Sequence, residues 1–273
     1  MVSSHLPNLS ASQVIALQDA LLANADSLLG SARTIFGIGN LGLARSLAIL
    51  AIEESGKAIA LHERRVAMAY EPEGIPFVND PLRRLFASHN AKLMTVHEFL
   101  VAENYWFGEP ADPAANAALL GAINLWAADK NRSKQRGFYV DISPDGALLA
   151  PPDVDNVASF EEILDRVHQI GWQLRLGEHI EAKHQEEEAR TVPPASDEER
   201  DALRMRFRRL SPELADRLVA AARRGRAGRD LNNDEYRFRL CEPDADPFEN
   251  NVKPGYEAET RELLRLLDEY ESD

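Results

Sequence analysis

The chain has 273 residues, a mass of 30.4 kDa and a formal net charge of −14, with an isoelectric point near 5.0. This length suffices for one large domain, or for one domain with an appendage, and either buries a real hydrophobic core. The acidic balance excludes a general polyanion binder, because phosphate contacts rest on Lys and Arg. We therefore expect no DNA partner, and any role in RNA binding requires a local basic site.

Cysteine usage and hydropathy indicate a compartment. The single cysteine cannot form an internal disulfide, and the first thirty residues contain no Lys or Arg and no continuous apolar run typical of a signal peptide. The apolar segment 41–60 is interrupted by Glu53, Glu54 and Lys57, so it falls short of the roughly 20 apolar residues that a membrane span needs. We expect a cytoplasmic protein that does not associate with a membrane.

Helical periodicity predicts an all-α fold, because apolar residues recur at intervals of three and four and no stretch alternates long enough for a sheet. The first helix begins after Ser10 as N-cap and ends near Gly30. Four more helices are predicted over about 40–70, 80–106, 113–132 and 159–189. The glycine-rich stretch 37–42 is predicted to be a helix–helix corner, and "RGFYVDISPDGALLAPPDV" a loop or short hairpin.

The sequence changes character near residue 190. The stretch 191–200 has the composition of a linker. Residues 204–229 then carry nine arginines against two carboxylates, and a short acidic helix is expected over about 256–270. We therefore expect a helical domain over residues 1–190 and an Arg-rich and acidic helical extension over 191–273. The arginines would bind RNA, a partner, or the chain's own acidic surface.

Two apolar helix faces are interrupted by polar residues. On the second helix Glu54 occupies a position in a stripe of leucines, and Lys57 lies three residues on, close enough for an intrahelical ion pair. On the third helix His89 sits at the centre of an apolar stripe, with Lys92 three residues further. The structural explanation is that Glu54 and Lys57 form an ion pair and that His89 is a core histidine whose ring nitrogens have hydrogen-bond partners. The functional explanation is that the two helices pack antiparallel and Glu54 orients His89.

Two arginines precede this histidine. Arg84 has four residues between it and His89, and Arg83 has five. Arg can hold a phosphate with two hydrogen bonds while His moves a proton. On one continuous helix Arg84 would lie about 140° round from His89, so either the long side chain bends round or a two-fold dimer completes the site.

Three blocks of sequence, "ARSLAILAIEESGKAIAL", "SHNAKL" and "RGFYVD", resemble the AbiV family of abortive-infection proteins, which belongs to the HEPN superfamily of helical bundles. The resemblance covers about residues 14–190. It implies a HEPN-like helical bundle and a homodimer. Many HEPN proteins are metal-independent endoribonucleases whose signature is an Arg, four to six residues and then a His.

By this resemblance His89 would act as general acid or base on a ribose 2′-hydroxyl or on the leaving oxygen, and Arg84 would neutralise the transition-state phosphate. No metal and no cofactor would be needed. Supporting positions would be Arg83, Lys57, Lys92, Lys134, Arg136 and Tyr139. The last three lie in "DKNRSKQRGFYVD", which combines cations that hold phosphate with a ring that stacks on a base; the alternative is a solvated helix end.

The sequence thus favours an antiphage abortive-infection protein, a HEPN-type endoribonuclease or translation inhibitor that acts on RNA when phage infection releases it through a phage or host protein trigger. An alternative is a non-catalytic binding module that captures a phage or host protein. A third is a metal enzyme built around Glu181 and His184, whose spacing resembles that of di-metal carboxylate bundles, although a solvated helix face explains the same residues.

Overall fold

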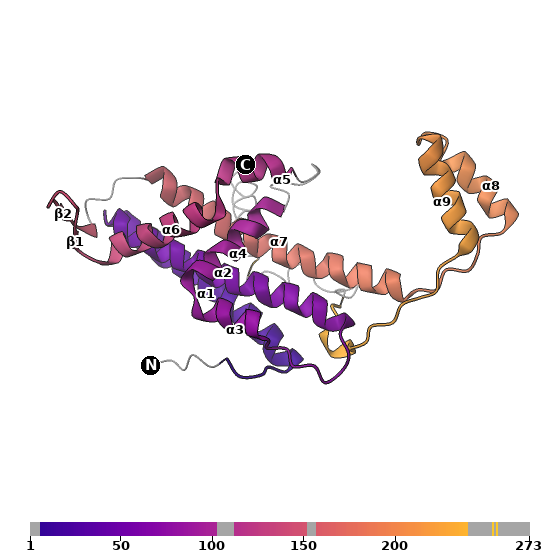
Figure 1. Cartoon of the computed structure of the whole chain (residues 1–273), viewed down its shortest axis with the longest axis horizontal. Coiled ribbons are helices and arrows are strands. Elements are labelled where there is room, and N and C mark those ends of the chain that lie inside the picture. The colour runs from indigo at the N-terminus through magenta and orange to yellow at the C-terminus, as the bar shows by residue number, and fades with distance from the viewer. Residues whose placement is uncertain (1–5, 103–111, 152–156, 240–252, 254, 256–273) are drawn as a thin grey trace, which may run out of the picture.

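The computed structural model describes residues 6–102, 112–151, 157–239, 253 and 255 (Figure 1). A helical bundle makes up most of this described part. Its helices are α1 (Ala11–Gly37), α2 (Leu41–Tyr70), α3 (Asp80–Ala87), α4 (His89–Ala102), α5 (Pro113–Leu120), α6 (Ile123–Phe138) and α7 (Val157–Ala189). Strands β1 (Asp141–Ile142) and β2 (Leu148–Leu149) form a two-stranded antiparallel hairpin. The predicted all-α bundle with a short hairpin insertion is confirmed.

Helix boundaries follow local capping. Ser10 caps α1 in a reciprocal capping box with Gln13, as its sequence position predicts. The helix continues beyond Gly30 to Gly37, because its buried face extends to Ala32. A glycine inside a helix costs about 1 kcal/mol, but it does not end a helix whose packing continues. The predicted corner at 37–42 is confirmed: Gly39 has φ 88°, and Asn40 caps α2.

Two predicted helices are each broken in two. The helix expected over 80–106 is interrupted at Ser88, which has extended φ and ψ of −118° and 121° and whose hydroxyl accepts a hydrogen bond from the Ala91 amide at 3.2 Å. Residues 103–106 lie outside the described residues. The helix expected over 113–132 breaks at Gly121, which has φ 76°, and its second part extends to Phe138. The 140° separation of Arg84 and His89 therefore does not apply, because a cap lies between them.

Helix α2 runs through the middle of the bundle and packs against α1, α4, α6 and α7. Glycines let two of these helices approach it closely. A Cβ at Gly137 of α6 would lie 2.0 Å from the Gly42 carbonyl oxygen, and a Cβ at Gly56 of α2 would lie 2.4 Å from the Lys92 carbonyl oxygen. Backbones this close leave no room for side chains between them at the two glycines. A short polar side chain such as Ser46 of α2 can therefore contact the backbone of α6 directly.

Beyond α7 the chain leaves the bundle and returns. Helices α8 (Asp197–Arg206) and α9 (Pro212–Arg224) form a hairpin beyond the end of α7, joined to it by two antiparallel segments that pair at Val192 and Arg226 (Figure 1). The short 3-10 helix η2 (Asp234–Tyr236) then packs on the bundle, where Tyr236 stacks on Phe77 with ring centroids 5.5 Å apart. The division at residue 190 stays a prediction, and the expected acidic helix over 256–270 lies outside the described residues. No described helix is long and apolar enough to cross a membrane.

The contact between α2 and α6 generates a stability prediction. We expect Gly137→Ala to lower the free energy of unfolding by about 3 kcal/mol, because its methyl group meets backbone and forces the helices apart. The matched control is Gly30→Ala in α1, where a Cβ meets nothing within 4 Å; it is expected to stabilise by up to about 1 kcal/mol. Urea unfolding of both variants measures the difference, and equal stabilities would contradict the close approach.

A buried histidine makes stability depend on pH. Burial, followed by the charges of Arg65 and Arg175, lowers the pKa of His62 from 6.5 to about 4. Well above pH 6.5 the ring is neutral in both the folded and the unfolded chain. Between pH 6.5 and 4 the unfolded chain binds a proton that the folded chain does not, so stability falls as the pH falls.

For the wild-type chain we expect this proton to cost up to about 3 kcal/mol of folding free energy by pH 4. His62→Gln removes the titrating group, so its stability should fall less over the same interval. Denaturant unfolding of both chains at pH 7, 5.5 and 4 tests this. Parallel pH profiles would show that His62 is protonated alike in both states.

Candidate functional site

Three side chains from three helices meet at one carboxylate. Glu53 Oε2 of α2 lies 2.5 Å from His89 Nδ1 at the start of α4, and Glu53 Oε1 accepts a hydrogen bond from the Lys134 ammonium of α6. Lys134 Nζ is also 3.2 Å from His89 Nδ1. The side chains of Glu53 and Lys134 are only 3% and 8% exposed, whereas that of His89 is 60% exposed. A buried ion pair therefore holds one edge of a histidine ring whose other edge faces solvent.

The helix faces explain why these residues meet. Glu53 lies on the α2 stripe that includes Gly42, Ser46 and Gly56, all of them buried. The Ser46 hydroxyl lies 2.7 Å from the Lys134 carbonyl oxygen and 3.0 Å from the Gly42 carbonyl oxygen, and its one proton is shared between them, which ties α6 against this stripe. The small residues bring α4 and α6 so close that Glu53 reaches side chains from both helices.

The prediction that Glu54 orients His89 is corrected by this geometry. Glu54 points to a different partner and pairs with Lys57 at 2.6 Å, as the structural explanation of this pair expects. The Glu54 stripe of leucines is only partly buried, because Leu43, Leu47 and Leu50 have intermediate exposure. His89 itself is exposed rather than set in a core stripe. The smaller, buried residues of α2 were the signal that would have identified Glu53.

Further lysines surround this centre. Lys92, one turn after His89, is buried, and burial lowers its pKa while the Glu53 carboxylate acts in the opposite direction. Glu54, Lys57 and Lys134 also act electrostatically on Lys92, so these groups are close together. Three lysines share two carboxylates, and the cluster carries an excess of positive charge. Such an excess favours a bound anion.

The helix break at Ser88 adds to this polarity. It makes His89 the first residue of α4, a 14-residue helix, so the histidine lies at the positive end of the helix dipole. Among the described residues, the second ring nitrogen of His89, Nε2, makes no hydrogen bond. With Nδ1–H donated to Glu53, Nε2 would carry the lone pair and could accept a proton from a solvent-side molecule.

Comparison with known proteins identifies the family of the chain. The family model for AbiV, within the HEPN group, matches residues 13–172, which is more than half of the chain. The chain belongs to the AbiV family. It is accordingly a HEPN-superfamily protein of the abortive-infection, antiphage class. No curated protein and no solved structure gives a significant match.

Arg83 and Arg84 of this AbiV-family protein lie on α3, before the helix break at Ser88, whereas His89 follows it. Arg84 is exposed in the last turn of α3, while Arg83 is partly buried and pairs with Asp80 at 3.0 Å. In the described part of the chain, neither guanidinium contacts the Glu53–His89–Lys134 cluster. The phosphate-binding role expected of Arg84 therefore stays a prediction.

Of the residues expected from "DKNRSKQRGFYVD", one enters the cluster. Lys134 does so through its hydrogen bond to Glu53. Arg136 is exposed, and its charge acts on the buried Arg45, whose pKa is lowered chiefly by burial. Tyr139 caps α6, with 67% of its surface exposed and its ring edge toward Phe138. Stacking on a base by Tyr139 stays a prediction.

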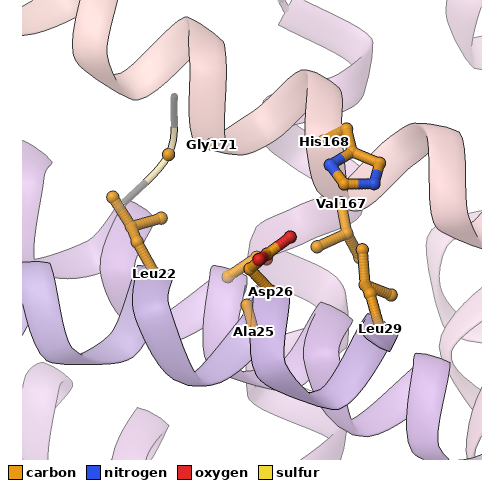
Figure 2. Close-up of a pocket in the computed structure, with 9 residues that line it drawn as sticks. Leu22, Ala25, Asp26, Leu29, Val167, His168 and Gly171 are labelled. Atoms are coloured by element: carbon orange, nitrogen blue, oxygen red, sulfur yellow. The ribbon is translucent and has the colours of Figure 1, made fainter. Parts of the chain in front are cut away.

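Two hollows of the AbiV-family fold lie away from the cluster. Figure 2 shows the first, where Leu22, Asp26 and Leu29 of α1 face Val167 and His168 of α7. Its volume of about 10 Å³ holds roughly one water molecule, which is too small for a substrate. The second, of about 700 Å³, is lined by residues of both charges beside the start of α1. His89 lines neither of them and presents its ring to open solvent.

The histidine of the metal-enzyme alternative has a carboxylate of its own helix as its partner. His184 Nε2 lies 3.5 Å from a carboxylate oxygen of Glu188 one turn later on α7, and the side chain of His184 is 55% exposed. In the described ranges, no three His, Cys, Asp or Glu residues gather in a way that could hold a metal ion. The pairing supports the solvated-face explanation of this helix.

The buried pair generates a stability prediction. We expect Glu53→Ala to lower the free energy of unfolding by about 3 kcal/mol or more, because it leaves the Lys134 ammonium buried without its carboxylate. Lys134→Ala leaves the Glu53 carboxylate buried without its ammonium. The double variant should therefore lose less free energy of unfolding than the sum of the two single losses. The control is Glu54→Ala, whose pair is more exposed and should cost about 1 kcal/mol or less. Denaturant unfolding of the four variants measures the coupling, and additive losses would contradict it.

Proposed function

We propose that this AbiV-family protein is a metal-independent endoribonuclease that cleaves RNA during phage infection, with His89 as the catalytic residue. One observation carries the proposal: a buried carboxylate holds one nitrogen of an otherwise exposed imidazole. A carboxylate that accepts Nδ1–H fixes the ring's orientation and tautomer, which is how general bases are prepared in hydrolytic sites.

The chemistry follows from this orientation. His89 Nε2 takes the proton of a ribose 2′-hydroxyl, and the 2′-oxygen attacks the adjacent phosphorus. The bond from phosphorus to the 5′-oxygen breaks, which leaves a 2′,3′-cyclic phosphate, and the departing oxygen takes a proton from a general acid. The excess positive charge of the lysine cluster and the N-terminus of α4 would stabilise the charge on phosphorus.

This reaction needs two proton transfers, and one imidazole supplies only one of them at a time. A homodimer that brings together two copies of His89 would supply both a base and an acid, and it would let Arg84 of either subunit reach the phosphate. We include this dimer in the proposal, because Arg84 and His89 of one chain are separated by the cap at Ser88. A non-catalytic binding module is the alternative, and the exposed position of Arg84, outside the cluster, is the observation that favours it.

The test is RNA integrity and phage protection in cells that express the full chain. We expect His89→Ala to reduce cleavage at least about 100-fold, the lower range for a general acid or base, and to abolish protection. The control is Asn90→Ala, an exposed neighbour on the same helix turn, which should behave as wild type. Thermal unfolding of each variant verifies that the fold is kept.

Two more variants test which of the two arginines, Arg84 or Arg83, acts together with His89. We expect Arg84→Ala to lose cleavage and Arg83→Ala to lose less, because Arg83 is already paired with Asp80. If wild-type expression protects against phage while tRNA, rRNA and mRNA stay intact, the ribonuclease proposal is wrong and the binding module is favoured. The same conclusion follows if His89→Ala protects as wild type does.

A further inference from the structure

A cavity of about 700 Å³ lies between α1, α2, α7 and residues 235–239, away from the His89 cluster. This volume falls within the range of roughly 300–1,000 Å³ that is typical of small-molecule sites. Among the described residues, four arginines and one lysine line the cavity, against three carboxylates. This is a local excess of positive charge in a chain whose net charge is −14. The cavity therefore favours an anionic ligand over a cationic one.

Two of these carboxylates already have a cation of their own. Arg175 of α7, only 5% exposed, pairs with Asp19 at 2.5 Å and with Glu178 at 3.1 Å. Glu178 also accepts a hydrogen bond from the side-chain amide of the buried Gln18 at 2.8 Å. This network ties α1 to α7. It leaves the exposed Glu235 as the one lining carboxylate that has no ion pair within the described ranges.

A buried guanidinium on the cavity wall is less completely paired. Arg65 of α2 is 6% exposed, its Nη2 donates to the Arg237 carbonyl oxygen at 2.9 Å, and its Cζ lies 3.8 Å from the centre of the Phe238 ring. Its Nε has no hydrogen-bond partner in the described part of the chain. Burial lowers the pKa of Arg65, and the two carboxylates that Arg175 holds act against this shift. A bound anion would act in the same direction as these carboxylates and stabilise the charged guanidinium.

The N-terminus of α1, a 27-residue helix, adds backbone donors to the same cavity. The Ser10 hydroxyl accepts a hydrogen bond from the Gln13 amide at 3.3 Å. The amides of Ala11 and Ser12 precede it in the first turn, where a helix offers no acceptor, and both residues line the cavity. The exposed Arg239 also lines it. Helix N-termini bind phosphate through such amides and through the positive end of the helix dipole.

These incompletely used groups define the ligand. They are guanidinium and amide donors, so the ligand must offer several acceptor oxygens at one end, as a phosphate group does. Ile15, 39% exposed, adds an apolar side chain to the wall. A free phosphate ion would leave most of the 700 Å³ unfilled, whereas a phosphate ester of nucleotide size would fill it.

We propose that this cavity binds a small phosphate ester of about the size of a nucleotide, with its phosphate group between Arg65 and the N-terminus of α1. The bound ester connects α1, α2 and residues 235–239. Because the cavity is separate from the His89 cluster, this binding stands or falls independently of the ribonuclease chemistry.

The first experiment tests the class of ligand. The full chain is titrated calorimetrically, in about 0.15 M salt, with AMP, ribose 5-phosphate, adenosine and inorganic phosphate. We expect at least one of the two esters to bind, inorganic phosphate to bind at least tenfold more weakly than that ester, and adenosine not to bind. No binding by either ester, equal binding by adenosine, or inorganic phosphate that binds as tightly as the esters would overturn the proposal.

The second experiment locates the phosphate. Ser12→Glu places a carboxylate at the N-terminus of α1, where an acid suits the helix dipole and should keep the fold, and we expect it to weaken binding of the ester at least tenfold. The matched control is Gln13→Glu, which adds the same charge one residue further, outside the residues that line the cavity, and keeps the capping box. It should bind the ester as wild type does.

A third variant removes the buried cation. We expect Arg65→Gln to weaken binding of the ester at least tenfold, and thermal unfolding verifies that this variant keeps its fold; if it unfolds, Ser12→Glu decides alone. Wild-type affinity in Ser12→Glu, or an equal loss in Ser12→Glu and Gln13→Glu, would show that the phosphate does not bind at the start of α1, and the proposal would be wrong.

Discussion

The site depends on one buried carboxylate. Taking Glu53 out of water is costly, and the cost is offset only because Lys134 meets one of its oxygens and His89 the other. This requirement links three helices, since α2 supplies the acid, α4 the imidazole and α6 the ammonium. The hydrogen bonds that compensate for burying the Glu53 carboxylate also fix the orientation of the His89 ring at the surface. Structural and chemical roles therefore cannot be separated at Glu53.

Close helix packing makes this meeting possible. Gly56 lets the α4 backbone approach α2, and Gly137 does the same for α6 against Gly42. With larger residues there, the helices would stand further apart and Glu53 would not reach both His89 and Lys134. The break at Ser88 is equally necessary, because a separate helix that begins at His89 turns the ring outward while its Nδ1 still reaches Glu53.

Much of the architecture was predictable from the sequence. The cap at Ser10, the long α2 and α7, and the hairpin after α6 follow from periodicity and turn residues. The breaks at Ser88 and Gly121 were missed, because apolar periodicity continues across both and a single cap residue is a weak local signal. His89 was a site candidate from its place in an apolar stripe and from its spacing to Arg84, and Lys134 from the basic block beside Tyr139, whereas the acid was assigned one residue away.

The sequence by itself determined the helical content, the family and the residue types available for chemistry, because these are set by local periodicity and by the order of short blocks. Only the tertiary structure decided that Glu53 and not Glu54 meets His89. The two neighbours lie about 100° apart on a helix, and both faces contain apolar residues. Which face is buried depends on the glycine contacts with other helices, and those contacts are set by the packing of segments that are distant in sequence.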